Sequence, residues 1–80
     1  MANAVRNIAK FIKRNPESED AAVLWELCKT LESESAFELQ RLFHLKLKAF
    51  EMSMALLDEW RIDRLIAERR IQKYLDLNDG

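Results

Sequence analysis

The sequence predicts an all-α protein, and two observations lead to that prediction. The only proline is Pro16 and the only glycine is Gly80, whereas strands are joined by turns rich in Gly, Pro, Asn or Asp. Hydrophobic residues make up 49% of the 80 residues, and they recur with the spacing of helices. We therefore expect a single helical domain over residues 1–80, with two short helices packed on one long C-terminal helix.

The first predicted helix covers residues 3–14 and is amphipathic. One side carries Ala4, Val5, Ile8, Phe11 and Ile12, and the other carries Arg6, Lys10, Lys13 and Arg14. This division is typical of a helix that packs one face on a core. The helix ends before Pro16, because a residue that precedes proline avoids the helical conformation. A basic amphipathic segment is also typical of attachment to a membrane surface, which remains an alternative for residues 3–14.

The second predicted helix runs from Pro16 or Ser18 to Leu31. Asn15 or Ser18 can cap its first turn, where acidic residues interact favourably with the positive end of the helix dipole. Its inner stripe consists of Leu24, Leu27, Cys28 and Leu31. Cys28 is the only cysteine, and we expect a small buried apolar side chain rather than a nucleophile.

A long third helix is predicted from about Ala36 to about Leu77. Ser35 and Glu38 have the spacing of a capping box, and no Gly or Pro follows before residue 78. The main apolar arc of this helix keeps its phase and contains Leu39, Leu42, Phe43, Leu47, Phe50, Met54, Leu56, Leu57, Trp60, Leu65, Ala67, Ile71, Tyr74 and Leu75.

Such a helix does not fit inside a compact chain of this length. It would be about 60 Å long, whereas a globule of this size is about 30 Å across. We therefore expect the helix to leave the monomer and pair with a second copy. The alternative is a break between Leu57 and Trp60, where Asp58 would cap a fourth helix in a monomer.

The distal part of the long helix is the predicted interface. Trp, Tyr and Arg are enriched among the residues that dominate binding energy, and they occur together after residue 57. The predicted interface residues are Leu57, Trp60, Arg64, Ala67, Ile71, Tyr74 and Leu75. We expect a non-enzymatic interaction or adaptor module that forms a homodimer or binds another helical protein.

A basic cluster at residues 61–73 predicts the alternative function, a regulatory protein that binds nucleic acid. Its members are Arg61, Arg64, Arg69, Arg70 and Lys73. Against this function, the cluster lies on two sides of the helix, and Asp63 and Glu68 interrupt it. The net charge of the chain is −1, so no overall attraction to phosphate is expected.

The composition argues against catalysis and against a bound cofactor. One histidine and one cysteine cannot supply a cluster of metal ligands, and a chain without internal glycine lacks a phosphate-binding loop. We therefore expect no enzyme, no metal and no cofactor. No apolar run is long enough for a transmembrane segment, and a lone cysteine fits a reducing compartment, so a cytoplasmic location is expected.

Overall fold

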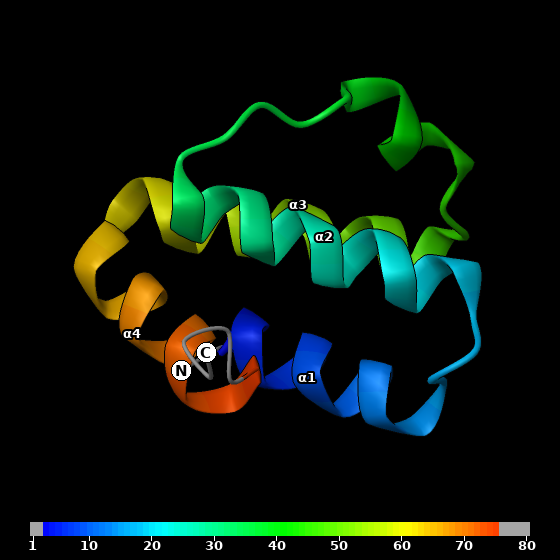
Figure 1. Ribbon diagram of the computed structural model, residues 1–80, viewed down its shortest axis with the longest axis horizontal. Coiled ribbons are helices and arrows are strands. Elements are labelled where there is room, and N and C mark those ends of the chain that lie inside the picture. The colour runs from blue at the N-terminus through cyan, green and yellow to red at the C-terminus, as the bar shows by residue number, and fades with distance from the viewer. Residues whose placement is uncertain (1–2, 76–80) are drawn as a thin grey trace.

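The computed structural model describes residues 3–75, and all regular structure within them is helical. Four α-helices and one short 3-10 helix follow one another: α1 (Ala4–Arg14), α2 (Glu19–Ser33), η1 (Leu39–His44), α3 (Leu47–Ile62) and α4 (Arg64–Leu75). They form a body of 28 × 28 × 24 Å (Figure 1). The predicted all-α class is therefore confirmed.

The first two helices form close to where the sequence predicts them. Asn3 caps α1, because its Oδ1 accepts a hydrogen bond at 3.0 Å from the backbone N–H three residues later. Ser18 caps α2 in the same way, with a distance of 3.2 Å from Oγ to the backbone nitrogen of Ala21. Helix α2 ends at Ser33, and the next residue, Glu34, has the left-handed conformation (φ 58°) with which helices commonly terminate.

The predicted continuous helix over residues 36–77 is wrong. The chain is non-helical over residues 35–38, forms η1, and begins α3 only at Leu47. The predicted capping box does not form, because the Ser35 hydroxyl bonds to a serine hydroxyl two residues earlier and Glu38 provides no side-chain cap to η1. In Figure 1 this segment arches above α2 and α3. The predicted end near residue 77 lies outside the described residues.

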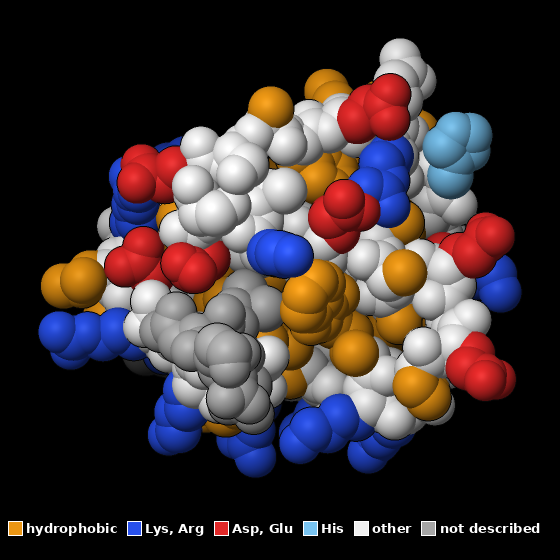
Figure 2. All heavy atoms as spheres, in the orientation of Figure 1, with side chains coloured by type: hydrophobic (Ala, Val, Ile, Leu, Met, Phe, Trp, Pro, Cys, Tyr) orange, Lys and Arg blue, Asp and Glu red, His pale blue; other side chains and the backbone are white. Residues whose placement is uncertain are grey.

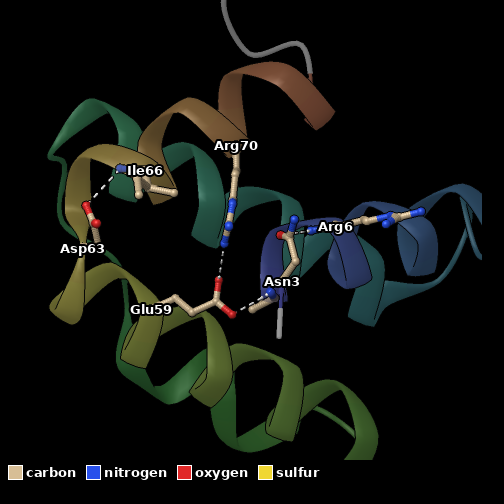
Figure 3. A network of polar contacts seen from close by, with 7 residues as sticks. Asn3, Arg6, Glu59, Asp63, Ile66 and Arg70 are labelled. Carbon is tan, nitrogen blue, oxygen red and sulfur yellow. Dashed lines mark hydrogen bonds and ion pairs between the residues drawn. The ribbon is translucent and has the colours of Figure 1, made fainter. Parts of the chain in front are cut away.

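A second break separates α3 from α4 at Asp63. The sequence-based alternative placed a break within residues 57–60 with Asp58 as the cap, but α3 continues through these residues to Ile62. Asp63 leaves the helical conformation (φ −144°, ψ 83°), and its Oδ1 accepts a hydrogen bond at 3.2 Å from the backbone N–H of Ile66 (Figure 3). The break and its cap therefore lie one turn later than predicted.

These two breaks have a common physical reason. When the chain folds back, apolar residues from both sides of the predicted long helix enter one core. A body about 30 Å across could not enclose these residues on a single straight helix. Helix α1 contacts each of the other three α-helices. The largest fully buried apolar side chains come from every element: Val5, Ile8, Leu24, Cys28, Leu42, Leu56 and Ile71.

One carboxylate connects three helices. Glu59 of α3 accepts a hydrogen bond at Oε2 from the backbone nitrogen of Ala4 at 2.8 Å, and its Oε1 lies 3.5 Å from Nη1 of Arg70 on α4 (Figure 3). Because Ala4 begins α1, the negative charge lies at the positive end of the α1 dipole. The side chains of Glu59 and Arg70 are less than one third exposed, so solvent screens this contact only in part.

We expect the Glu59→Ala substitution to lower the free energy of unfolding by about 1–2 kcal/mol, because α1 loses its acceptor and α4 its ion pair. Glu59→Gln keeps an acceptor and should lose less. Asp58→Ala is the matched control: within residues 3–75 Asp58 pairs with Arg61 alone, on the surface, and its loss should change stability by less than about 0.5 kcal/mol. Urea unfolding followed by circular dichroism measures all three; equal losses at positions 58 and 59 would contradict the assignment.

Candidate interaction surfaces

The predicted interface over residues 57–75 is largely packed against the core of its own chain. Ala67 and Ile71 are fully buried, and the residues packed on the core in part are Leu57, Trp60, Tyr74 and Leu75. Arg64 is the exposed member, and it forms an ion pair with Glu34 at 2.7 Å while its guanidinium lies 5.5 Å from the centroid of the Trp60 ring. The hydrogen bond and the charge of Glu34 raise the pKa of Arg64.

Ion pairs with acidic residues divide the predicted basic cluster at residues 61–73. Arg61 pairs with Asp58 at 2.8 Å, Arg64 pairs with Glu34, and Arg70 pairs with Glu59. Within residues 3–75, Arg69 and Lys73 are the members without an acidic partner. The pairing reduces the positive charge that this surface can offer to a phosphate chain.

Uncompensated positive charge gathers instead on α1. Its four basic side chains are exposed, and none forms an ion pair within the part of the chain that the structure describes: Arg6, Lys10, Lys13 and Arg14. In Figure 2 Lys and Arg side chains follow the lower edge of the molecule, below α1 and α4. The opposite face of α1 is buried at Val5 and Ile8, so this helix cannot lay its apolar face on a membrane while it stays in the fold.

A groove lies between α1 and α3 on the basic side of α1. Its volume is about 450 Å³, and its lining consists of Asn7, Lys10, Phe11, Arg14, Asn15, Lys48 and Met52. A second hollow of about 200 Å³ continues along the same two helices, shares Asn7, Lys48 and Met52, and adds Glu51 among others. Sequence patterning did not predict this groove, because Lys48 comes beside α1 only when the chain folds back before α3.

An exposed apolar strip lies on η1 and α3. The strip consists of Phe43, Leu47, Phe50 and Met54; Phe43, Leu47 and Met54 are exposed by 63%, 73% and 38%, whereas Phe50 is half-buried and packs against the core. The rings of Phe43 and Phe50 stack with their centroids 6.4 Å apart. Leu47, Phe50 and Met54 are three and four residues apart, so they share one face of α3. Sequence patterning assigned all four residues to the buried arc, because it continued the helical phase across residues 35–46.

A second exposed apolar group lies where α3 meets α4. Ile62, Leu65 and Ile66 are exposed by 69%, 59% and 47%. They surround the break at Asp63, and the turn separates Ile62 from the other two. All three side chains of this group are aliphatic, whereas the strip on η1 and α3 also contains the aromatic pair Phe43 and Phe50.

Metal ligands and the thiol of Cys28 are the groups whose chemistry the structure bears on. No group of three or more His, Cys, Asp or Glu side chains within residues 3–75 is placed to hold a metal ion. Cys28 is fully buried, and desolvation by burial raises the pKa of its thiol to about 12. A neutral buried thiol is a poor nucleophile, in agreement with the structural role expected for Cys28. None of the described helices has the length and apolar character required to cross a membrane.

The buried thiol makes the free energy of unfolding depend on alkaline pH. Unfolded Cys28 ionises near pH 9, whereas the folded thiol holds its proton until about pH 12, so the folded state binds more protons in this window. Stability should therefore be unaffected by Cys28 below pH 9 and should fall above it, by up to about 1.4 kcal/mol per pH unit.

Urea unfolding at pH 8, 9 and 10 would measure this dependence, with Cys28→Ala as the control that removes the thiol. The difference in free energy between the two proteins should shrink as the pH rises above 9. A difference that stays constant would contradict the assigned burial. Ellman's reagent should likewise react with native Cys28 only at the rate of unfolding.

Comparison of the chain with protein-family models, with curated proteins and with solved structures gave no match. The charges, exposed side chains and groove described above are therefore the basis on which a function is proposed.

Proposed function

We propose that the protein is a non-catalytic interaction module that self-associates through the apolar strip of Phe43, Leu47, Phe50 and Met54. The observation that carries this proposal is the run of large apolar side chains along η1 and one face of α3, in which Phe43, Leu47 and Met54 are exposed and Phe50 is half-buried. Single exposed apolar residues are common on monomers, whereas contiguous patches of several hundred Å² usually mark a binding site. The Phe43–Phe50 stack supports continuity between η1 and α3.

The size of the chain favours a second copy as the occupant. An 80-residue chain buries a smaller share of its surface than a larger domain, and small domains commonly add disulfides, metals or oligomerisation. One cysteine cannot form an intramolecular disulfide, and the described residues hold no metal-ligand cluster. Several core positions are also filled by alanine, which contributes little apolar area: Ala4, Ala9, Ala21, Ala49 and Ala67. Self-association is the remaining way for this chain to bury more apolar surface.

The geometry of α3 suits a symmetric pair. It has 16 residues and is therefore about 24 Å long, with the strip along its first half. Two copies related by a two-fold axis present the same strip to each other, as is usual in homodimers. Antiparallel pairing would bring Lys46 at the start of one α3 towards Asp58 of the other, where opposite charges favour the register.

This surface differs from the interface predicted at the C-terminal end. An interface through Ala67 and Ile71 would require the core of each chain to open, because both side chains are fully buried. The strip on η1 and α3 needs no such change. The proposed module therefore keeps the self-association expected from the sequence and moves its surface towards the start of α3.

Light scattering over a concentration series tests the proposal. The wild-type protein should approach twice the chain mass of 9.5 kDa. Leu47→Glu should weaken self-association by at least about tenfold, because it loses apolar burial and places a charge without a partner in an apolar interface. Leu65→Glu is the matched control, with the same chemical change at an exposed leucine outside the strip, and it should keep the dimer.

Two results would contradict the proposal. A wild-type protein that remains monomeric at the highest concentration would remove self-association. Dissociation by Leu65→Glu but not by Leu47→Glu would move the interface to the exposed group at Ile62, Leu65 and Ile66. Circular dichroism of both variants checks that a change in mass does not come from unfolding.

A further inference from the structure

A second surface of the molecule has a chemistry that self-association does not use. The groove between α1 and α3 has three cationic side chains at its lining, two amides, and an apolar floor: Lys10, Arg14 and Lys48; Asn7 and Asn15; Phe11 and Met52. No acidic residue is among the described residues that line its larger part, and the three cations have no acidic partner there. We propose that this groove binds single-stranded nucleic acid.

Charge is the first argument. The protein as a whole has a net charge of −1, yet α1 contains four basic residues and no acid. Most arginines elsewhere are held by acids, as Arg41 is by Glu26 and Arg64 by Glu34. Arg6, Lys10, Lys13 and Arg14 on α1 and Lys48 beside it are unpaired in the described chain, and this concentration gives a local positive potential that attracts phosphates.

Shape is the second argument. The larger hollow follows α1 from Asn7 to Asn15, a path of about 12 Å along the helix axis. A strand of two or three nucleotides can lie along such a path, with phosphates at Lys10, Arg14 and Lys48. The one acid, Glu51, lines the smaller hollow at the far end and would repel the chain there, so the larger hollow is the binding part.

The third argument comes from the apolar residues at the floor of the groove, which favour one class of ligand. Phe11 and Met52 are half-buried and line the groove, so bases can stack on an aromatic ring while the phosphates face the cations. An acidic peptide offers charge without flat rings. A membrane would need apolar side chains that protrude, and those of α1 are directed into the core at Val5 and Ile8.

This site differs from the basic cluster predicted at residues 61–73. Arg69 and Lys73 are the cations of that cluster without an acidic partner in the described chain, and neither lines the groove. They therefore provide an internal control. A double substitution there removes one arginine and one lysine, the same change in charge as a double substitution of Arg14 and Lys48.

Fluorescence anisotropy with a labelled oligothymidine tests the inference. The wild-type protein should bind at about 50 mM salt, and three phosphate contacts should give a slope of about −2 for the logarithm of affinity against the logarithm of salt concentration. Arg14→Gln combined with Lys48→Gln should weaken binding by more than about tenfold and flatten that slope towards −0.7. Arg69→Gln combined with Lys73→Gln should change the affinity by less than about threefold.

A third variant tests the role of the aromatic floor. Phe11→Leu keeps an apolar side chain on the core and removes the ring, so affinity should fall at least about fivefold while the salt slope is unchanged. Circular dichroism and urea unfolding confirm that each variant is folded. A loss of affinity with an unchanged slope separates stacking from charge.

The inference is overturned by any of three results. The first is the absence of wild-type binding to the oligonucleotide at low salt. The second is an equal loss in both double variants, which would mean unspecific attraction to any cation. The third is tighter binding to polyglutamate or to phosphatidylserine vesicles than to the oligonucleotide, which would assign the groove to an acidic protein or to a membrane.

Discussion

The whole fold depends on the packing of one short helix against three others. Helix α1 contacts α2, α3 and α4, and its buried face includes Val5 and Ile8. The α-helices share one core in this chain of 80 residues, and η1 packs on it through α3. The contact of Glu59 with the first turn of α1 adds a polar link at the same place. Segments that the sequence separates by more than fifty residues thus meet at α1.

The sequence is sufficient to predict the helices that local signals define. Pro16 marks the end of the first helix and Ser18 was one of two expected caps of the second, so α1 and α2 were expected almost where they lie; the cap at Asn3 was not predicted. These signals act over three or four residues. They do not depend on which surface the helix finally packs against.

The breaks after α2 and at Asp63 could not be predicted in the same way. The apolar phase runs on from Leu39 to Leu75 because α3 and α4 both face one core, and a periodic pattern cannot distinguish one helix from two that share a target. Ser35 and Glu38 even have the spacing of a cap. A continuous helix is disfavoured by the shape of the whole molecule and not by any local signal, because such a helix would be longer than the fold is wide.

The exposed apolar strip and the basic groove also result from the way in which the chain folds back. Phe43 is exposed although its spacing resembles that of core residues, because η1 directs its neighbour Leu42 inward; Leu47 is exposed at the first position of α3. Lys48 reaches the groove beside Lys10 only after the chain has turned back. Ion pairs such as Arg64 with Glu34 join residues that are distant in the sequence, so they cannot be read from periodicity. The sequence shows which residue types are present, but which of them come into contact depends on the fold.

Helix α3 keeps the two proposed surfaces apart. Leu47, Phe50 and Met54 lie on one side of it, whereas Lys48 and Met52 line the groove about a quarter to a half turn away around the helix. A partner on the strip would therefore leave the groove accessible. The proposed self-association and the proposed nucleic-acid binding can be tested separately by substitution, because the two surfaces share a helix and no side chain.

A single residue, Asp63, joins α3 to α4, and its side chain caps α4. A connection of one residue leaves the two helices little freedom to change their relative orientation. Helix α4 cannot swing away from the core as a rigid arm unless the last turn of α3 or the first turn of α4 also melts, and the buried side chain of Ile71 would be exposed at the same time. Loss of tertiary packing and loss of helix are thus coupled, which favours all-or-none unfolding over a partly opened state.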